Sequence, residues 1–482
     1  MPPTYTNPVA RRNFPDPFVL KFNGFYYAYA TGDAGDGRAI AAMSSPDLVH
    51  WEWHGGLLDP LPDTDLCDYW APEVIYHNGT FYLYYAVTPR GTIAHHLRVA
   101  IAEHPLGPFH DSGIDLTPNE LFAIDPHPFR DDDGTWYLFY ARDWLEGPRA
   151  GTGIVVDRMV DFTRLAGRPR RVLRPFAEWQ LFEKQRAEKW GLDWYTVEAP
   201  FAVKRRHRYV CFYSGGRWEH PGYGVGFLQS PALVADGDLA APDWEHHGDE
   251  QAASLLKAFG EWVLGPGHNS IAVAPNNVAE YLVYHGWDTR RQSRMPRLDR
   301  LEWNLTTPVT EGPTIEPQPV PPPPAICDRF DDRGVGLGGD WEQRSGSWTR
   351  EGGYAIADPG DHLGVAIAAL APSSYLLCEV NFHFTVTPGR CGAALLADVG
   401  NQAIVWVDAE EHVLRIDVVR EGHHPPPATV ALPPGFRPEV WHRLVVRRNG
   451  PALAAELDRL GSSPAHDRAG DGERVPTATR LG

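Results

Sequence analysis

The sequence predicts an all-β protein, a five-bladed β-propeller followed by a β-sandwich. Across roughly the first three hundred residues one unit recurs five times: a phrase rich in proline and carboxylates, an apolar strand, a tight polar turn and an aromatic strand. Repeats of about 40–50 residues or more built from short strands are typical of propeller blades, because one small sheet cannot bury both of its faces alone. A proline-rich stretch and a second region of alternating apolar and polar residues follow the repeats.

Each repeat opens on a phrase that we expect to form the innermost strand of a blade. In a propeller these strands begin around one central channel, so residues at equivalent positions face each other. Burying several carboxylates together is unfavourable unless their charge is shared, paired or used. The alternative, that they are turn residues beside proline, explains one phrase but not the recurrence. The residues expected to meet are Asp16, Glu73, Asp125, Glu198 and His268.

The strand after each phrase is rich in aromatic residues and is mostly entered through a polar turn. Asn23-Gly24, Asn78-Gly79 and Asp133-Gly134 are such turns, and these pairs are strong hairpin signals. Further apolar segments at 40–45 and 97–102 read as outer strands of the blades. The aromatic partner strands are expected at 25–29, 81–85, 136–140, 209–213 and 281–284.

An insertion at about 176–195 precedes the fourth phrase. Its first part, 176–185, is expected to form a helix, with Phe182 three places after Trp179 on one side. Because the insertion leads directly into Glu198, we expect it to form a wall at the rim of the pocket, with Trp194 contacting the substrate. The alternative is an element packed on the outside of the propeller.

The second half of the chain is divided by composition. The segment 317–325 is so rich in proline that an extended, semi-rigid spacer is expected between the propeller at 1–316 and a second domain at 326–460. In that second domain, segments such as 413–419 alternate apolar and polar residues, which is a β-sandwich pattern. The tail at 461–482 has the composition of a disordered segment. The sandwich is therefore expected to lack its closing strand.

Whole-chain composition narrows the class of partner. The chain has 482 residues and a net charge of −18, which argues against nucleic acid and anionic membranes and fits a neutral oligosaccharide. Its five cysteines show no metal or disulfide spacing. The first residues lack a basic and apolar signal region, and no apolar run is long enough to span a membrane. A cytoplasmic enzyme is expected, and the oligomeric state is left open.

The ordered phrases resemble glycoside hydrolase family 43, a family of five-bladed propellers, over about Asn7 to Pro317. The resemblance implies inverting hydrolysis, chiefly of α-L-arabinofuranosides and β-D-xylosides. It also implies that Asp16 is the general base, that Asp125 orients the acid and adjusts its pKa, and that Glu198 is the general acid. The C-terminal region resembles, more weakly, the concanavalin-like sandwiches appended to many family members.

The resemblance also suggests residues around the three carboxylates. Arg294 matches an arginine that family members often place near the pocket, with a surface position as the alternative. His268 matches a fifth-blade histidine that often holds a calcium ion through water, although no cofactor is required for the chemistry. Glu73 is expected either to bind a sugar hydroxyl or to make a structural hydrogen bond. Trp70 is expected to stack on a sugar ring, or else to pack between blades.

Three carboxylates suit one particular reaction. Inverting glycoside hydrolysis uses an acid and a base about 6.5–9.5 Å apart, and a third carboxylate keeps the acid protonated by raising its pKa. The predicted function is an exo-acting hydrolase that releases arabinofuranose or xylose from oligosaccharides or from side chains of plant polysaccharides. The alternatives are an endo-acting arabinanase and, less in keeping with the three acids, a non-catalytic carbohydrate-binding propeller.

Overall fold

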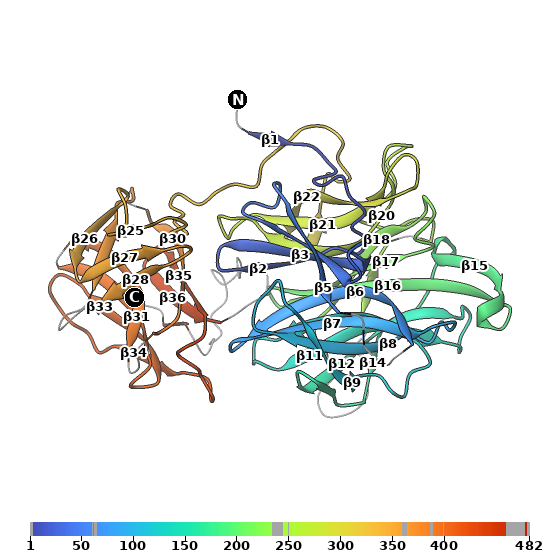
Figure 1. Ribbon diagram of the computed structural model, residues 1–482, viewed down its shortest axis with the longest axis horizontal. Coiled ribbons are helices and arrows are strands. Elements are labelled where there is room, and N and C mark those ends of the chain that lie inside the picture. The colour runs from blue at the N-terminus through green and yellow to red at the C-terminus, as the bar shows by residue number, and fades with distance from the viewer. Residues whose placement is uncertain are drawn as a thin grey trace. The chain divides into compact units, whose positions relative to one another are not determined.

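The computed structural model describes residues 3–59, 61, 65–233, 244–248, 250–358, 364–371, 373–385, 389–398, 400–458 and 478–479. Within these residues the chain contains β-strands, two single-turn 3₁₀ helices and no α-helix. It divides into two compact units, one mainly Met1–Pro322 and the other mainly Pro323–Glu439 with Arg443–Leu457 (Figure 1). No helix in the described part has the length and apolar character that crossing a membrane requires.

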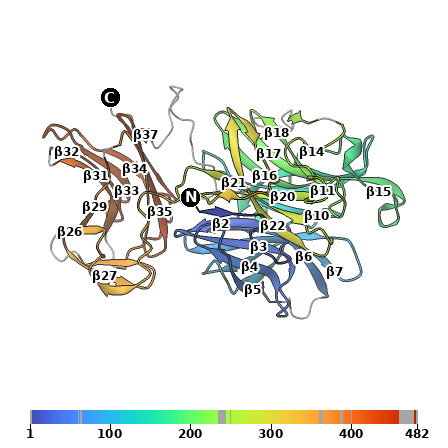
Figure 2. The same cartoon turned by 90° about the horizontal axis from the view of Figure 1, so that it is seen from above.

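The first unit consists of five blades of four main antiparallel strands each, and parallel pairing of β12 with β16 joins the third and fourth blades into one sheet. The first strands of the five blades, β2, β6, β10, β16 and β20, touch one another in cyclic order, with β20 returning to β2. The sheets therefore close into a five-bladed propeller, as the repeats predict (Figures 1 and 2). In chain order the blades are β2 (Phe18–Phe22), β3 (Phe25–Asp33), β4 (Ala39–Ser45) and β5 (Glu52–Leu58); β6 (Leu66–His77), β7 (Thr80–Pro89), β8 (His96–Ala102) and β9 (His110–Asp115); β10 (Ala123–Arg130), β11 (Trp136–Trp144), β12 (Gly151–Asp161) and β14 (Arg170–Leu173); β16 (Leu192–Arg205), β17 (Arg208–Gly215), β18 (Gly224–Ser230) and β19 (Glu245–His247); and β20 (Leu264–Val273), β21 (Glu280–Trp287), β22 (Arg294–Asn304) and β23 (Thr307–Val309).

The second strands of the blades carry the aromatic residues that fill the spaces between sheets. Tyr29 of β3 shares one buried cluster with Phe81 of β7, and Tyr84 shares the next with Tyr140 of β11. The hydroxyl groups of Tyr29 and Tyr84 each donate to a backbone carbonyl at 2.8 Å. Large apolar surfaces are therefore buried without leaving these hydroxyls unpaired.

The predicted hairpin turns are confirmed where the first two blades begin. Asn23 and Gly24 both have positive φ, and so do Asn78 and Gly79. A two-residue turn of type I′ requires this at both central positions, and its twist matches that of the flanking strands.

The inner strands share a β-bulge whose first residue is in the left-handed region. The pairing shifts between Trp70 and Glu73, and the corresponding shifts recur in β10, β16 and β20. In four blades the next residue is proline, which has no N–H to give to a ladder, and the bulge removes it from the pairing. The bulge residues are Asp16, Ala71, Asp125, Ala199 and His268, with φ between 45° and 57°.

This bulge corrects the predicted alignment of the five phrases. Asp16, Asp125 and His268 do occupy equivalent positions, but Glu198 precedes its bulge residue by one and Glu73 follows its own by two. Because successive side chains in a strand point to opposite faces, an offset of this kind changes where a side chain ends up.

The insertion before the fourth blade contains a hairpin in place of the expected helix. It has 3₁₀ turns at Glu178–Gln180 and Ala187–Lys189 and the strand β15 at Leu181–Arg186. The side chain of Gln180 accepts hydrogen bonds from the N–H groups of Phe176 and Ala177, which closes the first turn locally. β15 then pairs with the extended beginning of β16, whose free edge competes with helix formation.

The proline-rich linker begins as part of the first unit. Gln318–Pro319 forms β24, which pairs with β1 (Thr4–Tyr5), and the N–H of Asn276 donates to the carbonyl of Pro322. The linker is extended, as predicted, but its first residues are bound to the propeller unit.

The second unit contains the predicted sandwich. Phe382, Val405, Val407, Leu444 and Val446 lie in one buried cluster between its two main sheets. Ala478–Thr479 forms β37, a short closing strand beside β36, and the rest of the predicted disordered tail lies outside the described residues. One sheet contains β30 (Tyr375–Phe382), β35 (His442–Asn449), β36 (Ala452–Leu457) and β37; the other contains β31 (Arg390–Asp398), β32 (Asn401–Asp408), β33 (Val413–Val419) and β34 (Ala428–Ala431); smaller sheets contain β25 (Arg333–Val335), β27 (Ser347–Glu351) and β28 (Ala355–Asp358), and β26 (Trp341–Ser345) and β29 (Val365–Ala368).

Candidate active site

Asp16 sits at the first bulge, two residues before β2, and its carboxylate faces the fifth blade. Its Oδ1 lies 3.0 Å from Nη1 of Arg294 and 3.3 Å from Nδ1 of His268. Burial alone would raise the pKa of Asp16, but the charges of Arg294 and His268 outweigh it and hold the pKa well below 3.8. Asp16 is therefore ionised at any pH near neutrality.

His285 of β21 supports Asp16 through the backbone. The N–H of Asp16 donates to Nδ1 of His285 at 3.1 Å, so this nitrogen carries no proton. The same nitrogen lies 3.2 Å from Oδ1 of Asp16, but that contact is no ion pair, because burial lowers the pKa of His285 to about 4. His285 is thus a neutral acceptor that fixes the backbone of Asp16 in its left-handed conformation.

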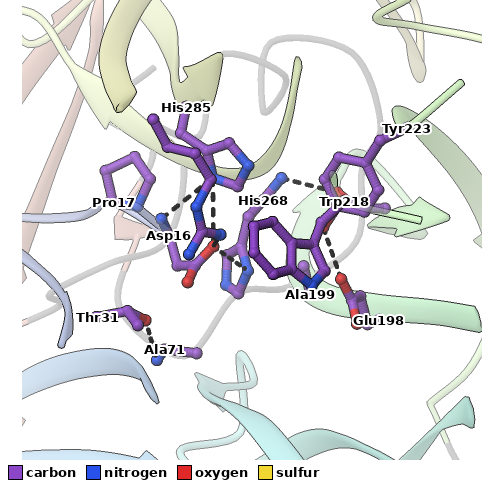
Figure 3. A network of polar contacts seen from close by, with 12 residues as sticks. Asp16, Pro17, Thr31, Ala71, Glu198, Ala199, Trp218, Tyr223, His268 and His285 are labelled. Carbon is purple, nitrogen blue, oxygen red and sulfur yellow. Dashed lines mark hydrogen bonds and ion pairs between the residues drawn. The ribbon is translucent and has the colours of Figure 1, made fainter. Parts of the chain in front are cut away.

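Glu198 of β16 has a raised pKa, in contrast to the lowered pKa of Asp16. Burial and then the nearby charge of Asp125 raise the pKa of Glu198 to about 8, although a hydrogen bond from Tyr223 opposes the shift. The hydroxyl of Tyr223 donates to Oε1 of Glu198 at 2.7 Å. Figure 3 shows Asp16 and Glu198 on opposite sides of the site, with Trp218 between them in this view. Near pH 7 one carboxyl is charged and the other is protonated.

Asp125 of β10 contacts the strand that carries Glu198. Its Oδ2 accepts a hydrogen bond from the N–H of Ala199 at 2.8 Å. Ala199 directly follows Glu198, so this bond fixes the backbone beside the acid. Burial raises the pKa of Asp125 as well.

Other bulges are held in the same way, by a side chain from the preceding blade. The N–H of Ala71 donates to Oγ1 of Thr31 at 2.7 Å, as Figure 3 shows, and the N–H of His268 donates to Oγ of Ser214 at 2.8 Å. These bonds join neighbouring blades at the level of the site. They also compensate for backbone conformations that are unfavourable for residues with a Cβ.

The rim of the site between the fourth and fifth blades is aromatic. Trp218, on the loop between β17 and β18, stacks on Trp287 of β21 with ring centroids 5.7 Å apart. Cζ of Arg294 lies 4.4 Å from the centroid of Trp218, so its guanidinium is held between this indole and Asp16. Trp218 is half-buried and leaves part of its surface to a ligand.

The sequence pattern of glycosyl hydrolases family 43 matches residues 5–307. The chain belongs to this family. It is a glycoside hydrolase, and the propeller that carries the three carboxylates is the matched region.

Several known proteins are similar to part or nearly all of this chain. An extracellular exo-α-(1→5)-L-arabinofuranosidase from Streptomyces chartreusis is 27% identical over 59% of this chain and 83% of its own. The crystal structure of a thermostable family 43 glycoside hydrolase is 31% identical, with a TM-score of 0.57, over 66% of this chain and 99% of that one. A family 43 protein from Bacillus licheniformis, 20% identical with a TM-score of 0.51, covers 99% of this chain and 91% of its own, which shows a shared fold over both units.

The other predicted site residues of this family 43 chain have different environments. Trp70 directly precedes its bulge residue, as Glu198 does, and its half-buried indole stacks on His95 at 3.8 Å. Arg294 is half-buried and forms an ion pair with Asp16, so it does not take the surface position given as the alternative. Glu73 is buried, and its Oε2 lies 2.7 Å from Nδ1 of His127, which favours the structural alternative.

Trp194 corrects a prediction. It has no exposed surface, and its indole N–H donates to Thr152 inside the third and fourth blades. Burial in β16 begins at Trp194, after the exposed Leu192 and Asp193, where the strand pairs with Glu183 of β15. It offers no face to a sugar.

The insertion packs beside the loop that carries Trp218 and Tyr223. Cζ of Arg217 on this loop lies 5.2 Å from the ring of Phe182, and the indole of Trp179 fills the space that a side chain at Gly215 would occupy. These contacts support the expectation that the insertion borders the pocket.

Sequence reasoning missed Tyr223, Trp218, Trp287, His285 and His127. Only His285 and His127 gave a usable signal, as histidines inside otherwise apolar or proline-marked strands. Tyr223 and Trp218 lie on a loop outside the repeated phrases, and nothing in their spacing points to Glu198.

His268 was predicted to contact a calcium ion through water. Among the described residues no group of three or more His, Cys, Asp or Glu side chains is placed to hold a metal ion. Burial would lower the pKa of His268, but the charges of Asp16 and Asp125 raise it to about 9. The side chains present therefore do not fit a calcium ion bound by direct coordination, and His268 is itself a cation among carboxylates.

Proposed function

We propose that this protein is an inverting, exo-acting glycoside hydrolase that releases α-L-arabinofuranose or β-D-xylose from oligosaccharides or from side chains of plant polysaccharides. The observation that carries the proposal is the contrast between Asp16, ionised through Arg294, and Glu198, protonated through burial and Asp125. Two carboxyl groups whose surroundings drive their pKa values apart are the base and the acid that glycoside hydrolysis needs.

The steps follow from these protonation states. Glu198 donates its proton to the glycosidic oxygen as the bond between this oxygen and the anomeric carbon breaks. Asp16 accepts a proton from the water whose oxygen forms the new bond on the opposite face of the sugar. Asp125 supports the acid twice, because its charge raises the pKa of Glu198 and its hydrogen bond fixes Ala199.

Substrate binding is assigned to the groups that border the acid and the base. The half-buried indoles of Trp70 and Trp218 offer apolar faces to one sugar. Nη1 of Arg294 donates to Asp16 and stabilises its negative charge, and the remaining N–H groups of Arg294 are donors for a sugar hydroxyl. Glu73 takes no part in this proposal, because His127 already engages its carboxylate.

Exo action is supported by the position of the insertion and by one relative. The hairpin of β15 and β16 packs against the loop of Trp218 and Tyr223, where it would limit a groove to one side. The similar Streptomyces chartreusis protein is named as an exo-arabinofuranosidase. Assays of nitrophenyl α-L-arabinofuranoside and β-D-xyloside side by side, with the anomer of the product read by NMR, test both the sugar and the inversion. Retention of configuration, or no turnover of either glycoside, would refute the proposal.

A calcium ion held only through water beside His268 is a separate part of the proposal. The adjacent Asn269 is buried, and neither polar atom of its amide has a hydrogen-bond partner among the described residues. Such an amide suits ordered water in the channel, whether or not that water also coordinates an ion. A chelator that leaves the melting temperature unchanged, with no rise when calcium is restored, would remove the ion from the proposal.

A further inference from the structure

The phenol of Tyr223 is buried in the site and donates a hydrogen bond to Glu198. Tyr223 is 1% exposed, and its hydroxyl lies 2.7 Å from Oε1 of Glu198. Burial and the neighbouring carboxylates raise its pKa well above 10, so the hydroxyl keeps its proton throughout the working range. Glu198 is the partner found for that proton among the described residues, which makes Tyr223 the donor and Oε1 the acceptor.

This donation decides which oxygen of Glu198 carries the catalytic proton. In a protonated carboxyl the carbonyl oxygen accepts hydrogen bonds better than the hydroxyl oxygen does, so Oε1, which accepts from the phenol 2.7 Å away, is the carbonyl oxygen. When Glu198 is protonated, its own proton is therefore placed on Oε2, the oxygen that remains for the glycosidic bond. Without Tyr223 both oxygens would be equivalent and the carboxyl could rotate.

The ring of Tyr223 packs against His285, the residue that fixes the backbone of Asp16. It stacks on His285 with ring centroids 5.9 Å apart and planes within 7°. A Cβ built on Gly267 would lie 2.0 Å from Cε1 of Tyr223, so the ring occupies space that only glycine at 267 leaves free. His285 in turn accepts from the N–H of Asp16.

Within the proposed hydrolase, we infer that Tyr223 is the positioning residue of the acid, and that the stacked pair of Tyr223 and His285 fixes the orientation of Glu198 relative to Asp16. The phenol selects Oε2 as the donating oxygen. The ring sets the distance of that oxygen from the backbone that carries the base. Neither ring touches the reacting atoms.

The inference predicts an unusual pH dependence. The charged or titratable groups that face Glu198 are Tyr223, Asp125, His268 and Asp16. Of these, Tyr223 stabilises the carboxylate by hydrogen bonding, so its loss should raise the pKa of Glu198 further. A variant that lacks the phenol should work more slowly near neutrality but keep its activity to higher pH.

Tyr223→Phe tests this with the ring retained. On substrates with poor leaving groups we expect about a tenfold loss of kcat/KM, the usual effect of removing one hydrogen bond to a group that becomes charged as it gives up its proton in the transition state. On activated aryl glycosides, which need little protonation, we expect less than a threefold loss by the same reasoning. The basic limb of the kcat/KM profile should move to higher pH.

Tyr209→Phe is the matched control. Tyr209 lies on β17 in the same blade as Tyr223, and its hydroxyl also donates to a carboxylate, that of Asp131 after β10, at 2.6 Å and outside the site. This variant should leave the basic limb and the leaving-group dependence unchanged. Gly267→Ala is a second probe, because it displaces the ring of Tyr223 while keeping the hydroxyl, and it should reproduce the loss on poor leaving groups.

The outcomes separate this inference from the proposed function. If Glu198→Gln abolishes turnover of natural linkages while Tyr223→Phe and Gly267→Ala both behave like the unmodified protein, the inference is wrong and the hydrolase stands. If Tyr223→Phe lowers all substrates equally without moving the basic limb, Tyr223 has only a structural role. If Glu198→Gln itself has no effect, the proposed function fails.

Discussion

Nη1 of Arg294 lies 3.0 Å from Oδ1 of Asp16, although the two residues are 278 positions apart in the chain. Arg294 begins β22 in the last blade, and Asp16 precedes the first strand of the first blade. The pair therefore forms where the ring of blades closes. A property needed for catalysis, an ionised base in a buried place, depends on this closure.

The activity should fall as the pH rises through about 8. The acid must be protonated, and Glu198 loses its proton around that value. Asp16 has a pKa well below 3.8, so it should cause no loss between pH 7 and 5. A kcat/KM profile on an oligosaccharide measures both limbs.

In Asp125→Asn the basic limb of this profile should move to lower pH, because a negative charge that raises the pKa of Glu198 is gone. An unmoved basic limb would contradict the role of Asp125.

Glu198→Gln should separate substrates by leaving group. We expect losses of about 10²–10⁴ on natural linkages, which need a proton in the transition state, and much smaller losses on activated aryl glycosides. Steady-state kinetics on both classes is the measurement. Equal losses on both would show that Glu198 is not the acid.

Arg294→Met should move the acid limb to higher pH. Arg294 provides the largest influence that lowers the pKa of Asp16, so without it Asp16 binds a proton at a higher pH and the base is lost as the pH falls. The same change should lower kcat/KM at pH 7 by about tenfold. Arg300→Met in the same strand is the control, because Arg300 is exposed and packs on Tyr281 away from the site. A shift in both variants would point to a general charge effect.

Ala71→Gly should stabilise the protein or leave its stability unchanged. Ala71 has a φ of 45°, a conformation that costs a residue with a Cβ about 1–2 kcal/mol, against about 0.5–1 kcal/mol for the extra freedom of glycine when unfolded. Ala86→Gly on the partner strand is the comparison, because Ala86 is fully buried and has no positive φ. Melting temperatures should fall clearly for Ala86→Gly alone. A comparable fall for Ala71→Gly would mean that the bulge is not strained.

Hydrolysis of arabino- or xylo-oligosaccharides should release monosaccharide from the first minutes. The insertion borders the loop of Trp218, so binding should be confined to one buried sugar with few contacts beyond it. Chromatography of early time points measures this. Early di- and trisaccharides would instead indicate an open groove and an endo-acting enzyme. If the hairpin closes one side of the pocket, removing residues 181–191 should increase the share of internal cleavage.

The sequence by itself determined the propeller and the meeting of three acids. Five repeats of one phrase imply rotational equivalence, and the starts of the inner strands must converge around the channel, so Asp16, Asp125 and Glu198 could be grouped without coordinates although Glu198 lies one residue off the equivalent position. The hairpin turns followed from Asn-Gly pairs, whose positive φ is a local property. A backbone preference of this kind belongs to the two residues themselves and does not depend on the surrounding fold.

Only the tertiary structure decided the finer placement. The offset of Glu198 and Glu73 depends on a bulge whose position is set by pairing with the next strand. Trp194 was turned inward by that same extended strand, and 176–185 took a hairpin because the free edge of β16 was available to it. Tyr223 and Trp218 reach the site from a loop that follows no repeat, so their contacts with Glu198 and Arg294 arise from packing between distant segments, which no periodicity records.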